Sequence, residues 1–193
     1  MIDDEELRHK LEAYLEAAEE YMQKGQRQRA LLEFEKAATT LKAEEKLDQL
    51  EQLWGHAASG FSAAGASEQA GYSHLHIAEL HALAGRQADA RDSYLAAANA
   101  FFNVREKTRE IWTIIAQSVE QAIDFCIALD EHTEAIDLLV KCATIYQRET
   151  GFQIDAINCL ERATQLLEQV PGHPLAAEIE ERLQLLIDEQ SKS

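Results

Sequence analysis

Residues 14–37 read YLEAAEEYMQKGQRQRALLEFEKA, a stretch in which small and bulky side chains recur at helical spacing on both sides of one glycine. Ala30, Phe34 and Ala37 share one face of the helix expected after Gly25. The same order of glycine, alanine, bulky residue and alanine recurs at Gly85, Ala90, Tyr94 and Ala97 and at Gly151, Ala156, Leu160 and Ala163. Looser copies occur at Gly65, Ala70, His74 and Ile77 and at Asp130, Ala135, Leu139 and Cys142. A turn followed by a helix with small side chains at regular places, repeated along a chain, predicts stacked helical hairpins.

Apolar periodicity predicts nine helices and an all-α protein. Their expected ranges are 4–24, 26–43, 45–64, 67–84, 86–104, 107–129, 131–149, 152–169 and 174–190. The expected turn residues, which would take a left-handed conformation after a helix, are Gly25, Gly65, Gly85 and Gly151. Ser67, Asp130 and the segment 171–174 supply further caps and breaks. No stretch alternates as a strand would, and neither Asn-Gly nor Asp-Gly occurs.

These features predict one domain, a right-handed α-solenoid of about four helical hairpins with a C-terminal capping helix. The expected hairpins are 1–43, 44–84, 85–129 and 130–170, and the cap is 171–193. The helix expected at 107–129 carries apolar residues on more than one face, so it is either sandwiched between other helices or docked against another chain. Phe102 and Trp112 lie on either side of a basic stretch, residues 105–109, at the start of this helix.

Composition restricts the classes of partner. The chain has 18 basic and 35 acidic residues, and its net charge of −17 would repel a phosphate backbone, so we expect no nucleic-acid partner. No apolar segment approaches the roughly 20 residues of a spanning helix, so we expect no membrane insertion. The first residues, 1–6, do not begin a secretory signal. Three cysteines, Cys126, Cys142 and Cys159, form no C-x-x-C pair and suit reduced thiols in a core. We therefore expect a soluble cytoplasmic protein.

The first expected hairpin overlays on the second when the numbering is shifted by 40 residues, which brings Tyr14 onto Trp54, Tyr21 onto Phe61 and Gly25 onto Gly65. The aligned residues resemble the tetratricopeptide repeat (TPR) family, in which bulky aromatic and small residues alternate in the first helix and alanine, an aromatic and alanine follow in the second. The matching residues are Tyr14, Ala18, Tyr21, Ala30, Phe34 and Ala37, and then Trp54, Ala58, Phe61 and Ala70.

Each expected helix also resembles its neighbours. Long helices, acidic charge and phrases such as QIDAINCL at 153–160 are similar to the soluble NSF attachment protein (SNAP) branch of that superfamily, over about residues 10–170. This resemblance implies a non-catalytic adaptor or scaffold, with a place in vesicle trafficking or complex assembly. The partner it implies is a protein.

The resemblance also implies a binding surface, because ligands of such repeats usually meet first-helix residues one and five positions beyond the bulky aromatic. Around these positions lies a polar, largely acidic set, which we predict to form a concave protein-binding groove: Glu12, Glu19, Gln23, Gln52, Ser59, Glu120 and Asp124. A groove of this kind would take a basic or helical segment. The alternative is an ordinary solvated helix face.

Two other functions stay open. Residues 51–100 carry only five acidic and two basic side chains, so the chain could instead be an obligate subunit of a larger helical scaffold that covers these helices. Four histidines, His56, His74, His76 and His81, raise the alternative of a metal- or small-ligand-binding bundle. They lack the i, i+4 pair of a helical zinc site, so we assign no metal ligand and no cofactor. No catalytic motif is present, and we predict no catalytic residues and no enzyme.

Overall fold

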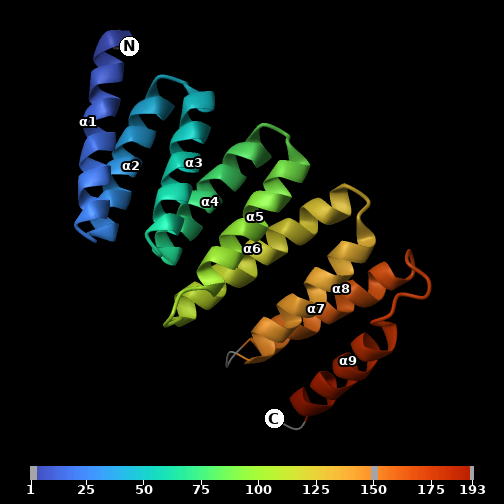
Figure 1. Ribbon diagram of the computed structural model, residues 1–193. Helices are drawn as coiled ribbons and strands as arrows, with labels where there is room; N and C mark the ends of the chain where they lie inside the picture. The colour runs from blue at the N-terminus through green and yellow to red at the C-terminus, as the bar shows by residue number, and fades with distance from the viewer. Residues whose placement is uncertain (1–3, 149–151, 192–193) are drawn as a thin grey trace.

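The computed structural model describes residues 4–148 and 152–191, and the described chain is built from helices joined by short turns (Figure 1). The helices are α1 (Asp4–Gln23), α2 (Arg27–Ala43), α3 (Leu47–Ala63), α4 (Ser67–Leu83), α5 (Gln87–Phe102), α6 (Arg109–Ala128), α7 (His132–Arg148), α8 (Gln153–Leu167) and α9 (Ala176–Gln190). Each range expected from the sequence coincides with one of them, with boundaries that differ by a few residues. The predicted turn at Gly151 lies outside the described residues.

Five turns have the same hydrogen-bonded form. In the first, the N–H of Gln26 donates to the carbonyl of Tyr21 at 2.8 Å and the N–H of Gly25 to that of Met22 at 3.0 Å. This is the Schellman arrangement, which needs a residue with positive φ at the helix end. The residues with positive φ in these turns are Gly25, Glu45, Gly65, Gly85 and Asp130. The prediction is confirmed at the three glycines, and Asp130 also ends a helix as expected. The sequence does not predict the turn at Glu45, because glutamate rarely adopts positive φ.

The first four of these turns are evenly spaced, at positions 25, 45, 65 and 85. The next lies at position 130, which is five residues beyond two further periods of twenty. Between them, α5 ends at Phe102 and α6 begins only at Arg109, where Thr108 caps the helix by accepting a hydrogen bond from the N–H of Ile111 at 3.3 Å. The loop 103–108 therefore interrupts an otherwise regular repeat.

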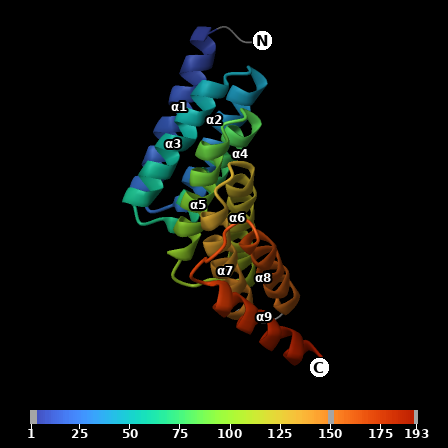
Figure 2. The ribbon, with the colours of Figure 1, turned by 90° about the vertical axis from the view of Figure 1, so that its right-hand side faces the viewer.

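The helices form two layers. Each helix packs against the next in the chain, and Figure 2 shows the odd-numbered helices α1 to α9 on one side and the even-numbered helices α2 to α8 on the other. The described chain is thus an α-solenoid of four helical hairpins followed by a terminal helix. It contains no helix long and apolar enough to cross a bilayer.

The repeated small and bulky residues lie in the core, as the pattern predicts. Those that are at most 3% exposed include Ala18, Ala30, Phe34, Ala37, Ala58, Phe61, Ala70, Ala90, Ala97, Ala135, Leu139, Cys142, Ala156, Leu160 and Ala163. They belong mainly to two clusters, which we call the N-terminal core, formed largely by α1–α4, and the C-terminal core, formed by α5–α9. Burial of these apolar faces is the main stabilising contribution in each half.

The two cores meet at Gly71. A Cβ placed on Gly71 of α4 would lie 2.7 Å from the ring of Phe101 in α5, so a side chain larger than hydrogen does not fit there. The next residue, Tyr72, packs edge-on against the same ring, with the ring centroids 5.0 Å apart. Tyr72 contacts both cores, and Phe101 is fully buried. These three residues therefore form a joint between the two halves.

Helices α6 and α9 of the C-terminal half pack as the sequence predicts. Helix α6 lies between α5 and α7 and buries Ile115, Ile123 and Cys126, so the expected sandwich is what the structure shows. Helix α9 covers the last hairpin through Ile179 and Leu186. Before it, the buried ring of His173 accepts a hydrogen bond at Nδ1 from the N–H of Leu175, at 3.3 Å.

Candidate functional site

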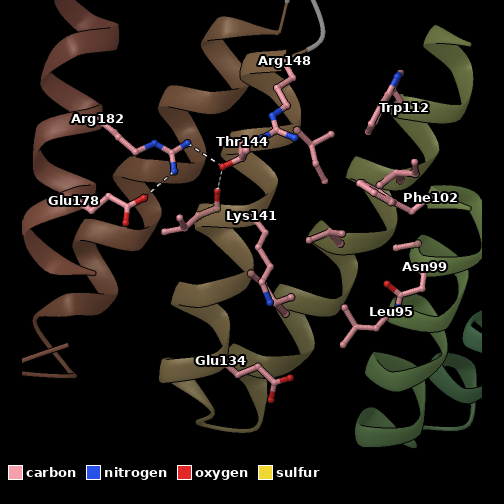
Figure 3. A pocket seen from close by; sticks show the side chains of 16 residues that line it. Leu95, Asn99, Phe102, Trp112, Glu134, Lys141, Thr144, Arg148, Glu178 and Arg182 are labelled. Atoms are coloured by element: carbon pink, nitrogen blue, oxygen red, sulfur yellow. Dashed lines mark hydrogen bonds and ion pairs between the residues drawn. The ribbon is translucent and has the colours of Figure 1, made fainter. Parts of the chain in front are cut away.

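A groove of about 560 Å³ lies between α5 and α7 on the odd-numbered side of the molecule (Figure 3). Its floor comes from α6, and α9 borders it on the far side of α7. Apolar side chains dominate the lining: Leu95, Ala98, Phe102, Trp112, Ile115, Val119, Leu138, Val140 and Ile145. We call this site the α5–α7 groove. The groove lies next to the irregular part of the repeat, because the loop 103–108 connects α5, which forms one wall, to α6, which forms the floor.

One end of the groove is aromatic. Phe102 is 48% exposed and packs edge-on against Trp112, with the ring centroids 5.8 Å apart. The Nζ atom of Lys107 lies 5.2 Å from the first ring and 5.5 Å from the second, and it also donates a hydrogen bond to the carbonyl of Val104 at 2.9 Å. Exposed aromatic surface of this kind supplies large contact area to a bound partner.

A line of charged residues runs along the groove face of α7. Glu134, Lys141 and Arg148 are seven residues apart, which places them on one face of the helix. Glu134 lies 3.9 Å from the guanidinium of Arg91. Within the described part of the chain, no carboxylate pairs with Lys141 or Arg148. The groove is therefore bordered by two cations that no described carboxylate pairs with, although the protein as a whole is strongly acidic.

A third cation at the groove, Arg182 of α9, is already occupied. It donates to Thr144 Oγ1 at 3.1 Å and to Glu178 Oε1 at 3.4 Å, as the dashed lines in Figure 3 show, and it also bonds Gln147. These bonds tie α9 to α7. Arg182 thus stabilises the wall of the groove, while Lys141 and Arg148 remain available to a ligand.

Five of the seven residues predicted to bind a partner lie on the odd-numbered side but outside the α5–α7 groove. Glu12, Glu19 and Gln23 are on α1, Gln52 and Ser59 are on α3, and all five are exposed. Glu19 lies 3.6 Å from His56 of α3, and Glu12 pairs with residues of its own helix, Arg8 and His9. These residues form a polar surface over the N-terminal half.

Glu120 and Asp124 lie on α6, in the even-numbered layer, so the structure does not bring them together with the other five (Figure 2). Glu120 accepts a hydrogen bond from the hydroxyl of Tyr146 at 3.1 Å, and Asp124 pairs with Arg162 at 2.6 Å. Both residues belong to α6, the second helix of the third hairpin, whereas α1 and α3 are the first helices of their hairpins. One helix of offset moves a side chain to the other layer.

Some residues of the α5–α7 groove can be recognised in the sequence. Phe102 and Trp112 stand out around the basic stretch, and the spacing of Glu134, Lys141 and Arg148 is visible in the helical pattern. What the sequence does not contain is the distance between α5 and α7. That distance decides whether these side chains line an open groove or pack against one another.

The four clustered histidines have separate surroundings. His76 stacks on Trp54 with centroids 4.2 Å apart, and His56 faces Glu19. His81 is buried and contacts Glu51 through Nε2 at 3.0 Å. Hydrogen bonds from Arg86 and His81 lower the pKa of Glu51 from 4.5 to about 2. Within the described ranges, none of these histidines belongs to a group that could hold a metal ion.

The architecture defines a TPR-like α-solenoid, and the comparison with protein families gives a more specific assignment. The family model for soluble NSF attachment protein, SNAP, matches residues 17–186, which is most of the chain. The chain belongs to the SNAP family. No curated protein matches it.

The solved structures that match this chain include the following proteins. A kinesin light chain with nearly identical TPR-like repeats, from Podosopora anserina, is 15% identical with a TM-score of 0.49, and the match covers 100% of both chains. A substituted form of that protein is also 15% identical, with a TM-score of 0.48, and the match covers 95% of this chain and 97% of that one. BtubC from P. vanneervenii is 11% identical with a TM-score of 0.40, covering 97% and 93%.

Proposed function

We propose that this protein is a non-catalytic adaptor that binds a protein partner in the α5–α7 groove. The bound segment is an amphipathic helix with acidic residues beside its apolar face. One observation carries the proposal: an open apolar groove bordered by Lys141 and Arg148, which pair with none of the described carboxylates, on a chain whose net charge is −17. Exposed apolar surface with a charged border is typical of protein-binding sites.

The dimensions of the groove fit a short helix. Glu134 and Arg148 are 14 positions apart on α7, which corresponds to about 21 Å or four helical turns. A helix of that length offers apolar side chains at positions i, i+3, i+4 and i+7 to the groove lining. Acidic side chains on its flanks would meet Lys141 and Arg148, which favours association and sets the register. A basic helix would meet like charges instead.

The proposal is tested by selecting helical peptides of about 16 residues from a displayed library against the purified full-length chain. The selected peptides should combine an apolar stripe at helical spacing with Asp or Glu on its flanks. Their affinity should fall at least about tenfold in Phe102→Glu, because this change places a charge among the aromatic residues at the groove end.

Leu83→Glu is the matched control, since Leu83 is a large apolar residue that is 86% exposed and lies outside the groove. This variant should bind the selected peptides as the wild type does. Equal losses in both variants, or no loss in Phe102→Glu, would contradict the groove assignment. So would a selection that yields only basic peptides or peptides without an apolar stripe.

A second candidate surface consists of the five exposed polar residues on α1 and α3, for which we propose a basic segment of a partner as ligand. Its support is the exposure of Glu12 and Glu19 and the acidic excess of the first 50 residues. Reversal of both residues to Lys should weaken binding of basic peptides and leave acidic amphipathic peptides unaffected. The opposite result would exclude this surface. Glu120 and Asp124 are not part of this surface, because α6 lies in the even-numbered layer.

Membership of the SNAP family supports a place for this adaptor in complexes of vesicle trafficking or protein assembly, with the cytoplasm as the compartment. This part of the proposal rests on analogy with the family. It is tested by expressing the tagged chain in its own cells and identifying the proteins whose co-purification depends on Phe102 but not on Leu83. Partners that contain no acidic amphipathic helix would count against the proposal.

A further inference from the structure

Two cysteines and a glutamate from three consecutive helices converge in the C-terminal core. Cys142 of α7, Cys159 of α8 and Glu120 of α6 each direct one ligand atom to a point where these atoms all lie within 4.8 Å of one another. Both cysteines are almost completely buried, while Glu120 is half-buried and gives the cluster one side towards solvent. We propose that these three side chains form a binding site for one thiophilic divalent cation of the Zn²⁺ class.

The spacing of the three groups suits such a cation. With Zn–S bonds of about 2.3 Å and a Zn–O bond of about 2.1 Å, tetrahedral geometry separates the ligand atoms by roughly 3.5–3.8 Å. The ligand atoms lie within 4.8 Å of one another, so binding of the ion would draw them together by about 1 Å or less. Three protein ligands leave the fourth position to water, which enters from the side of Glu120. Two thiolates with one carboxylate select Zn²⁺ or Cd²⁺ over Mg²⁺ or Ca²⁺.

Binding of a cation by the two cysteines releases protons. The neighbouring thiol of Cys159 and burial raise the pKa of Cys142, which favours the protonated form of this side chain before a cation arrives. Binding forms two metal–sulfur bonds, breaks two S–H bonds and releases two protons to solvent. No oxidant or reductant takes part. Affinity should therefore increase as the pH rises.

The surroundings of Glu120 support the site. The hydroxyl of Tyr146 donates to Oε1 of Glu120 at 3.1 Å, which helps to fix the orientation of the carboxylate. Hydrogen bonds of this kind orient metal ligands and typically contribute 10- to 100-fold in affinity. Tyr146 is buried in the C-terminal core, so this arrangement is preorganised.

A second cluster in the same half shows the contrast. Cys126, Glu131 and Glu134 also bring their ligand atoms within 4.8 Å of one another. Here the guanidinium of Arg91 already pairs with Glu131 and lies 3.9 Å from Glu134, so a protein cation occupies the place that a metal ion would take. No guanidinium or ammonium group is ion-paired to Glu120 in the described residues. The Cys142–Cys159 cluster is therefore the one that is open to a cation.

The test uses Cd²⁺ as the probe, because thiolate–cadmium bonds give a charge-transfer absorption in the ultraviolet. The purified full-length chain, reduced with a phosphine, should bind one Cd²⁺ with this absorption, and added Zn²⁺ should remove the band. Cys142→Ser and Cys159→Ser should abolish it. Cys126→Ser should retain it, and is the matched control because Cys126 is an equally buried thiol.

Glu120→Gln provides a variant that is not expected to disturb the core, since its side chain is half-buried and similar in shape. It should weaken Cd²⁺ binding about 10- to 100-fold while the thiolate band persists at saturation. The proposal is overturned if the wild type shows no charge-transfer band, if the band survives in Cys142→Ser, or if Glu120→Gln binds Cd²⁺ as tightly as the wild type.

Discussion

The N-terminal and C-terminal halves of this solenoid are packed with different side chains, and they differ in what they leave open. Of the 14 residues in the N-terminal core, seven are alanine and none is isoleucine or valine. The C-terminal core contains six isoleucines and two valines. In the first half evenly spaced turns follow one another, and in the second the loop 103–108 interrupts them. The α5–α7 groove lies in the half where the repeat is interrupted.

In this chain the α5–α7 groove accompanies the interruption of the repeat and the bulkier core. Alanines at equivalent positions let neighbouring helices approach closely, and a fully regular stack buries the surface between them. Bulky β-branched residues and an extended loop fill space less uniformly. The half that is easiest to recognise as a repeat is thus not the half that offers the groove.

The joint between the two halves gives the largest expected effect. Phe101→Ala removes a fully buried ring from this joint and should destabilise the protein by about 3–5 kcal/mol. Trp54 reports on the N-terminal core and Trp112 on the C-terminal half, so urea unfolding of single-tryptophan variants should show two separated transitions after the substitution. Phe102→Ala, at a 48% exposed ring, should change the unfolding free energy by less than about 1 kcal/mol. Coincident, unshifted transitions in Phe101→Ala would show that the joint does not couple the halves.

Gly71 and Gly60 are helical glycines whose neighbours leave different amounts of room for a side chain. Gly71→Ala should destabilise by about 1–3 kcal/mol, because the new methyl group would meet the Phe101 ring at 2.7 Å. Gly60→Ala should be neutral or stabilise by up to about 1 kcal/mol, since its Cβ would meet the flexible end of Met22 at 3.3 Å and alanine favours the helix. Thermal denaturation of both variants tests this. Equal effects in the two variants would mean that Gly71 is not a close-contact position.

The network of Glu51, His81 and Arg86 connects α3 to the turn before α5 and should give a smaller, pH-dependent effect. Because the pKa of Glu51 falls from 4.5 to about 2 in the folded state, its contribution to stability is present above pH 4.5 and is lost as the pH falls towards 2. Its side chain is 33% exposed, so solvent screening limits the contribution to about 1 kcal/mol. Glu51→Gln should lower the unfolding free energy by that amount at neutral pH. The difference from the wild type should shrink in acid, and a constant difference down to about pH 3 would contradict the assignment.

The sequence predicts the helices and most turns because their causes are local. Gly25, Gly65 and Gly85 mark helix ends directly, whereas Glu45 adopts the same turn although glutamate rarely takes positive φ. Ala30, Phe34 and Ala37 predict a buried face from spacing alone. These signals need no knowledge of distant residues.

The candidate site depends on relations that a single sequence does not carry. The predicted groove groups Glu120 and Asp124 with residues of α1 and α3, but α6 is the second helix of its hairpin and lies in the other layer. The α5–α7 groove depends on where α7 lies relative to α5 after an irregular loop. Conversely, Lys141 and Arg148 attract notice only once the structure shows that they have no acidic partner among the described residues.

The central claim, that the α5–α7 groove binds acidic amphipathic helices, is tested most directly by equilibrium binding of a selected peptide to Lys141→Glu and Lys42→Glu. Both substitutions reverse one exposed lysine that has no ion-pair partner in the described chain, but only Lys141 borders the groove. Lys141→Glu should weaken binding about tenfold or more, and Lys42→Glu should leave it within about twofold of the wild type. Equal affinities for the two variants would contradict the claim.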